Sequence, residues 1–172
     1  MNFTSFYQHM AMKDTPMLDV KLALELEPKF WAEKPRIKIQ FNEQSLFEDY
    51  LEEIKKFDWT LPAKDSNRLS VFFLNKTERD TVGDKDKAVI VKSIGVEGFH
   101  YSSFMLQSKY CPTYTKGYHQ YAKENNLSTD PIINSNYLGF NGEWYLEFTW
   151  PVYQWIFETE TQGMGWIYEK NI

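Results

Sequence analysis

The chain has 172 residues, of which 42% are hydrophobic and 25% charged, and its formal net charge is −5. This length suits one domain with its own core, and an acidic chain without a Lys/Arg cluster argues against nucleic-acid binding. No apolar run approaches the roughly 20 residues of a membrane span, the first residues lack the pattern of a signal peptide, and one cysteine, Cys111, excludes an internal disulfide. The sequence therefore predicts a protein made in a reducing cytoplasm, with neither nucleic acid nor a membrane as a partner.

The first strong pattern lies at residues 18–27, where large apolar residues occupy every even position. Side chains alternate between the two faces of a β-strand, so one face of this segment is predicted to be buried and the other solvated, as in an antiparallel sheet. The buried face consists of Leu18, Val20, Leu22, Leu24 and Leu26. Residues 1–17 precede this strand and are interpreted as an N-terminal arm.

Residues 35–41 alternate in the same way and predict a second strand, which ends in the turn residues 42–45. The next apolar residues are spaced as on one face of a helix, and Ser45 with Glu48 fits a capping box. We therefore predict a helix over residues 46–57. Its apolar face consists of Phe47, Tyr50, Leu51, Ile54 and Phe57.

Four further strands are predicted, and their segments are residues 59–61, 69–74, 87–96 and 137–149. The alternation slips near Ser93, which indicates a bulge or a strand buried on both faces, and Asn141-Gly142 is a strong turn signal. Between the last two strands, residues 110–136 form a long excursion with a helical turn near residues 119–126. Residues 151–158 read as a strand or a helical turn.

Together these elements predict a single all-β domain over residues 1–172. The fold class is an antiparallel two-sheet β-sandwich, jelly-roll-like, with one or two short helices.

The loop after residues 69–74 is rich in hard oxygen ligands. Asp80, Asp84 and Asp86, with backbone carbonyls, supply several of the six to eight oxygens that calcium takes. Their spacing is not that of a helix-loop-helix calcium site, and Arg79 and Lys85 lie among the acids. A calcium site, a turn stabilised by Asp and Thr side chains, and a contact site for a partner protein therefore remain alternatives, and calcium is the one cofactor that the sequence suggests.

Tyrosines gather in the 110–136 excursion, where no predicted strand buries them. Aromatic rings stack on sugar faces in ligand sites and anchor protein interfaces, and they also pack on one another within a loop. Core packing is the default for Trp144 and Trp155. The residues predicted to bind a partner protein or a glycan are Tyr110, Tyr114, Tyr118, Tyr121 and Trp150.

No catalytic motif emerges from the sequence. The three histidines are far apart, and neither a Gly-x-Ser-x-Gly elbow nor a phosphate-binding glycine loop is present. Carboxylates at Glu143, Glu147 and Glu158 lie near aromatic residues, which leaves a glycoside hydrolase as an alternative. Glu143 and Glu147 fall on the solvated face of a predicted strand, so we predict that the protein is not an enzyme.

Three stretches resemble a group of small β-sandwich proteins of tailed bacteriophages, especially marine ones. They are residues 69–82 (LSVFFLNKTERDTV), 86–98 (DKAVIVKSIGVEG) and 137–148 (YLGFNGEWYLEF), followed by Pro-Val-Tyr-Gln-Trp at 151–155. The resemblance implies a non-catalytic structural protein of the phage particle, made in the host cytoplasm, located in the virion as a decoration, tail or fibre-associated component. Its partners would be other virion proteins or further copies of itself. The layout is also similar to jelly-roll carbohydrate-binding modules, which implies the alternative function of glycan binding, with calcium in a calcium-dependent module.

Overall fold

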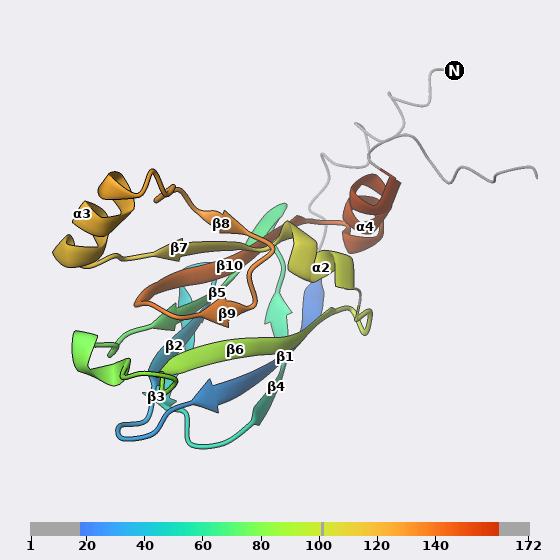
Figure 1. Ribbon diagram of the computed structural model, residues 1–172. Helices are drawn as coiled ribbons and strands as arrows, with labels where there is room; N and C mark the ends of the chain where they lie inside the picture. Colours follow the sequence, from blue (N-terminus) through green and yellow to red (C-terminus); the bar gives the residue numbers. More distant parts are fainter. Residues whose placement is uncertain (1–17, 101, 162–172) are drawn as a thin grey trace, which may run out of the picture.

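The computed structural model describes residues 18–100 and 102–161, and its architecture is a β-sandwich (Figure 1). A four-stranded sheet has the order β4-β1-β6-β9, and a six-stranded sheet has the order β3-β2-β5-β10-β7-β8. All the pairings between these strands are antiparallel. The predicted fold class is therefore confirmed.

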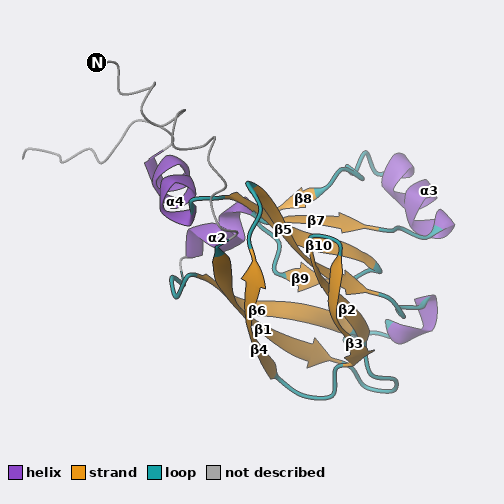
Figure 2. Ribbon diagram, turned by 180° about the vertical axis from the view of Figure 1, so that it is seen from behind, coloured by secondary structure: helices purple, strands orange, loops and turns teal. Residues whose placement is uncertain are grey.

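The first sheet contains β1 (Asp19–Lys29), β4 (Lys55–Pro62), β6 (Ala88–Val96) and β9 (Tyr137–Leu138). The second contains β2 (Arg36–Phe41), β3 (Gln44–Tyr50), β5 (Ser66–Phe73), β7 (Lys109–Pro112), β8 (Ile132–Ile133) and β10 (Gly142–Thr149). The helices are η1 (Glu78–Asp80), α2 (Ser102–Gln107), α3 (Lys116–Glu124) and α4 (Val152–Thr161). Figures 1 and 2 show α2 and α4 together at one end of the sandwich and α3 at the other.

The core lies between the two sheets and follows the alternation that the sequence shows. On β1, Val20, Leu22, Leu24 and Leu26 are buried, whereas Leu18 precedes the strand and is 49% exposed. Inward residues of β2, β5 and β10 complete the core from the opposite sheet, and they are Ile37, Ile39, Phe41, Leu69, Val71, Phe73, Trp144, Leu146 and Phe148. Burial of this much apolar surface is the main stabilising contribution to the fold.

The predicted slip in β6 is a β-bulge. Glu25 of β1 pairs with Ser93, but the next residue, Leu26, pairs with Val91, so Lys92 is the extra residue. The Lys92 Nζ lies 2.9 Å from a Glu27 carboxylate oxygen. The bulge keeps apolar residues directed inward on both sides of the slip.

The predicted helix over residues 46–57 is wrong. Residues 44–50 form β3, which pairs with β2 through a tight turn at Asn42 and Glu43, and residues from 55 onward form β4. The apolar residues of this segment have helical spacing by coincidence. They come from two different strands, β3 and β4, and from the connection between them, in which Leu51 is buried. Asn42 adopts φ of 52°, which suits the tight turn and commits the chain to a hairpin.

Other predicted segments agree with the structure in part. The 110–136 excursion contains β7, α3 and β8, and the helix begins at Lys116, earlier than predicted. All of residues 151–158 except Pro151 belong to α4, which is the helical alternative. The N-terminal arm, residues 1–17, lies outside the described residues, and in the part of the chain that is described no helix is long and apolar enough to cross a membrane.

Candidate functional site

Tyr110 is a core residue and not part of a binding surface. Its side chain is 1% exposed, and its hydroxyl donates to the carbonyl of Phe140 (2.6 Å) and accepts from the amide of Phe140 (2.9 Å). Burial raises the pKa of this phenol well above its ordinary value. Tyr110 lies on the inward face of β7, and its ring is in the core beside the connection that leads into β10. The prediction that Tyr110 binds a partner protein or a glycan is therefore wrong.

Tyr114, which precedes α3, and the tyrosines of α3 pack largely on one another. The rings of Tyr114 and Tyr118 stack with centroids 4.4 Å apart, and both contact the Phe140 ring edge-on at 5.0 and 5.1 Å. Thr115 caps the helix by accepting a hydrogen bond from the amide of Tyr118. These contacts attach α3 to the edge of the sandwich, and they correspond to the alternative in which the tyrosines pack on one another within the loop. Tyr121 is the most exposed ring of the group, at 54%.

Trp150 does not join these tyrosines. It follows the C-terminal end of β10, where its amide donates to the carbonyl of Asp65, whereas Tyr114 and Phe140 lie beyond the N-terminal end of that strand. The eight residues of β10 span about 25 Å. The five residues that the sequence grouped therefore do not form one surface.

The acidic loop is organised by lysines. Asp80 accepts from the amide of Thr77 (2.6 Å), from the Thr77 hydroxyl (2.9 Å), and pairs with Lys87 Nζ at 3.0 Å. Asp86 pairs with Lys76 and accepts from the hydroxyls of Thr81 (2.7 Å) and Tyr137 (2.5 Å).

The structure does not assemble the three aspartates into a metal-ligand set. Asp84 is exposed in the turn that Val82 and Lys85 close by mutual backbone hydrogen bonds. The oxygens of Asp80 and Asp86 are taken by ammonium, hydroxyl and amide donors, and in the described ranges no group of three or more His, Cys, Asp or Glu side chains could hold a metal ion. These residues do not fit calcium, because their charge is already balanced by Lys76 and Lys87.

Asp80, which is buried, and Asp86, which is partly buried, both have lowered pKa values. Burial by itself raises the pKa of each, but the donors outweigh it: Thr77 and Lys87 at Asp80, and Lys76, Tyr137 and Thr81 at Asp86. Both carboxyls are therefore ionised in the folded protein at lower pH than in the unfolded chain.

This shift predicts a pH dependence of stability. A carboxyl whose folded pKa is depressed stabilises the fold above its unfolded pKa, 3.8 here, and that contribution is lost as the pH falls through the folded value. We expect Asp86→Asn to be less stable than the wild type near neutral pH and to lose less stability between about pH 5 and about pH 2. Thermal unfolding followed by circular dichroism measures this difference, with the exposed Asp84→Asn as the matched control. An equally steep acid profile for wild type and Asp86→Asn would contradict the prediction.

The carboxylates considered for hydrolysis are held in a network on the outer face of the six-stranded sheet. Arg68 donates to Glu143 from Nε (3.2 Å) and Nη2 (2.8 Å) and to Glu147 from Nη1 (3.2 Å), and the Ser70 hydroxyl also donates to Glu143. The guanidinium carbon lies 3.5 Å from the centre of the Tyr145 ring and so covers that ring. Glu158 lies on α4, where it accepts from Gln154 Nε2, and so the structure does not bring it into a pair with Glu143.

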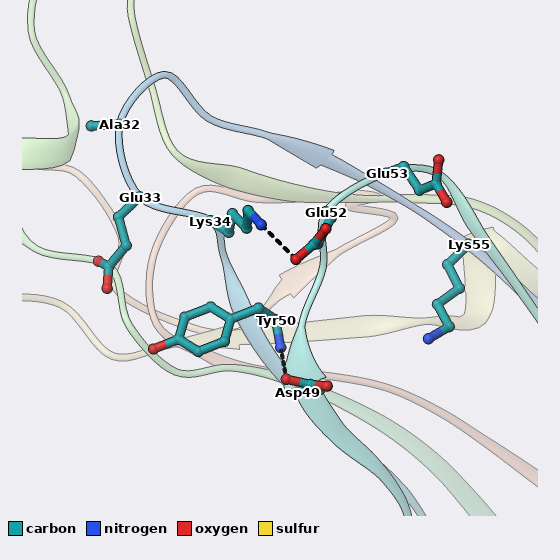
Figure 3. Close-up of a pocket in the computed structure, with 8 residues that line it drawn as sticks. All are labelled: Ala32, Glu33, Lys34, Asp49, Tyr50, Glu52, Glu53 and Lys55. Atoms are coloured by element: carbon teal, nitrogen blue, oxygen red, sulfur yellow. Dashed lines mark hydrogen bonds and ion pairs between the residues drawn. The ribbon is translucent and has the colours of Figure 1, made fainter.

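A cleft lies where two chain segments cross between the sheets. The connection from β1 to β2, residues 30–35, and the connection from β3 to β4, residues 51–54, meet at the same end of the sandwich, because Leu26 pairs with Lys55 and Arg36 pairs with Tyr50. The cleft has a volume of about 630 Å³. Its lining residues are Ala32, Glu33, Lys34, Asp49, Tyr50, Glu52, Glu53 and Lys55 (Figure 3).

Hydrogen bonds fix both walls of this cleft. Lys34 Nζ lies 2.5 Å from the Glu52 carboxylate, and the amide of Leu51 donates to the carbonyl of Pro35 (2.8 Å). The Asn75 side chain bridges the carbonyl of Lys34 and the amide of Arg36. In the view of Figure 3, Glu33 and Tyr50 lie on one side of the Lys34–Glu52 pair, and Glu53 and Lys55 lie on the other.

The cleft presents one aromatic ring among charged groups. Tyr50 is 44% exposed, and its amide donates to the Asp49 carboxylate at 2.8 Å. Six of the eight lining residues are charged, four of them acidic and two basic. Sequence reasoning missed this site because it placed residues 46–57 on a helix; the available signal was Phe30-Trp31 in the loop between two predicted strands.

Neither the known protein-family models nor the curated proteins gave a match. Among solved structures, the chain is similar to a selenomethionine form of vCBM60, which is described as providing, through circular permutation, a link between two families of calcium-dependent carbohydrate-binding modules. The TM-score is 0.47 and the sequence identity is 16%, and the match covers 74% of this chain and 89% of that chain. It is also similar to vCBM60 in complex with galactobiose, with TM-score 0.46, 18% identity, and coverage of 75% and 97%. At these values the likeness does not indicate what this chain binds.

Proposed function

We propose that this protein is a non-catalytic carbohydrate-binding protein whose ligand lies in the cleft between residues 30–35 and residues 49–55. The observation that carries the proposal is the cleft itself, in which the half-exposed ring of Tyr50 is surrounded by carboxylates and ammonium groups. A pyranose has an apolar face that stacks on an aromatic ring and hydroxyls that donate to carboxylates, so both kinds of group have a partner here.

The charge of the cleft restricts the class of glycan. Four carboxylates and two ammonium groups give the lining a formal charge of −2. A ligand with carboxylate or sulfate groups is repelled, and an apolar ligand would strip water from charged groups without replacing their hydrogen bonds. Neutral or amino sugars therefore fit this lining best.

The test is binding to a panel of neutral oligosaccharides, with galactobiose among them because a structural neighbour was solved with it. We expect Tyr50→Ala to weaken binding at least about tenfold, because an aromatic anchor is lost. Tyr121→Ala is the matched control, since that ring is also exposed but lies on α3.

Isothermal titration calorimetry in EDTA and in calcium chloride measures these affinities and separates a calcium-dependent site from the one proposed. Loss of binding in Tyr121→Ala with none in Tyr50→Ala would move the site to α3. Binding of uronic-acid polymers in preference to neutral chains would contradict the proposed ligand class.

Attachment to another protein is a second candidate, favoured by the segment from α3 to β8. The helix α3 lies at one end of the sandwich, and β8 is the edge strand of the six-stranded sheet beside β7 (Figures 1 and 2). The exposed apolar residues from α3 to β8 include Tyr121, Leu127 and Ile133. Apolar side chains of this kind anchor interfaces. Association with a phage particle, the function implied by the sequence resemblance, stays a prediction, and copurification with intact virions tests it.

A further inference from the structure

Lys87 is a fully buried ammonium group at the cleft end of the sandwich. Its side chain is 0% exposed, and its Nζ donates to the Glu33 carboxylate (2.8 Å) and to the carbonyl of Asn75 (2.8 Å) and lies 3.0 Å from Asp80 Oδ2. A buried charge is costly unless it is paired and hydrogen-bonded, and here each of the three ammonium hydrogens has an oxygen in reach.

A second lysine completes the arrangement. Lys76 Nζ pairs with Asp86 and donates to the carbonyl of Lys87 at 2.8 Å. The two ammonium groups therefore neutralise the carboxylates of Glu33, Asp80 and Asp86. They are surrounded by carboxylate and carbonyl oxygens, as a bound metal cation would be.

This cluster is joined to the cleft through residues 30–35. Glu33, which pairs with Lys87, also lines the cleft. Two residues earlier, the indole Nε1 of Trp31 donates to the carbonyl of Asp80 at 3.0 Å. One buried side chain thus connects the acidic loop to the segment that forms one wall of the binding site.

We propose that the Lys87 ammonium is the built-in cation of this end of the sandwich, and that it positions residues 30–35, and hence the cleft, without a metal ion. Lys87 is then a positioning residue and not a ligand-binding one. The statement about positioning the cleft rests on the proposed function, whereas the statement about the cation does not.

The first experiment replaces Lys87 by methionine, which is unbranched and one heavy atom shorter and which removes the charge. We expect the Tm to fall by about 5 °C or more, because the Asp80 carboxylate stays buried without its counter-charge. We also expect the Trp31 indole N–H resonance, assigned through its loss in Trp31→Phe, to shift or broaden in ¹H–¹⁵N spectra. Lys92→Met is the matched control, because it also breaks a lysine–glutamate pair but a more exposed one.

The second experiment restores the cation. We expect n-propylammonium to raise the Tm of Lys87→Ala, and 1-propanol, which has the same chain without the charge, to have no such effect. Should neither Lys87 variant fold, Glu33→Gln removes one partner from a half-exposed position and the Trp31 resonance is read in that chain.

The outcomes separate the two proposals. Calcium chloride raising the Tm of the wild type, EDTA lowering it, or an unchanged Tm and Trp31 resonance in Lys87→Met would each overturn the built-in cation. Neither readout uses a glycan, so absence of glycan binding defeats the proposed function alone. If a glycan binds, an unchanged affinity in a folded Lys87→Met would overturn the link to the cleft.

Discussion

Replacing Gly142 by alanine is expected to lower the free energy of unfolding by about 3 kcal/mol or more. Gly142 adopts φ of 147°, which L side chains rarely adopt, and a Cβ there would meet the carbonyl oxygen of Cys111 and lie 2.8 Å from the Cα of Pro112. Those atoms belong to the backbone of the paired strand β7, so they cannot move away without breaking the β7–β10 ladder. Urea denaturation measures the change.

Gly95→Ala is the matched control for this substitution. A Cβ at Gly95 also meets close neighbours, but they are ring atoms of His100, an exposed side chain that can rotate away. We expect a loss of less than about 1 kcal/mol. Equal destabilisation by the two substitutions would show that backbone crowding at β7 is not the cause.

Leu24→Ala is expected to destabilise the fold by about 2–5 kcal/mol. Leu24 is 2% exposed on β1, which pairs with β4 on one side and β6 on the other, so neighbouring strands cannot close the cavity. Chemical denaturation of both Leu24→Ala and Leu18→Ala tests the reason. Leu18 belongs to the same sequence stripe but is 49% exposed, and its truncation should cost about 0.5 kcal/mol or less; a similar cost at both positions would contradict this account.

The sandwich itself could be predicted from the sequence because one face of each strand is buried. On β1 the period of two persists from Asp19 to Leu26 and on β10 from Glu143 to Thr149, and the burial of the side chains alternates in the same way. Even the bulge at Lys92 was visible, since an extra residue reverses the phase of the pattern. The order of residues within one strand is enough to predict which of its faces is buried, because successive side chains point to opposite faces.

The hairpin at residues 42–43 could not be recognised in the same way. Phe47 and Phe57 fit a helical spacing, yet they lie on strands of different sheets, where their rings contact edge-on at 5.1 Å. The chain between them crosses from one sheet to the other, and a crossing has no periodicity of its own. The cleft formed by this crossing was missed for the same reason.

The acidic loop shows what residue types alone leave open. Three aspartates within seven residues were consistent with calcium, and their nearest charged neighbours in sequence include Lys85. Their actual partners include Lys87, and Lys87 in turn is completed by Glu33, 54 residues away. Whether a carboxylate faces a metal, a lysine or water depends on such long-range packing, which a single sequence does not contain.

The stacking of Arg68 on Tyr145 affects which ligands can bind to the outer face of the six-stranded sheet. A neutral ring can reach Tyr145 only by displacing a guanidinium that three hydrogen bonds tie to two glutamates. Such a ligand returns no positive charge to Glu143, whose side chain is only 24% exposed, so the exchange is unfavourable. A planar cation can compete for the same place, whereas an uncharged ring gains no ion pair there. This face of the six-stranded sheet is therefore expected not to bind neutral ring-shaped ligands.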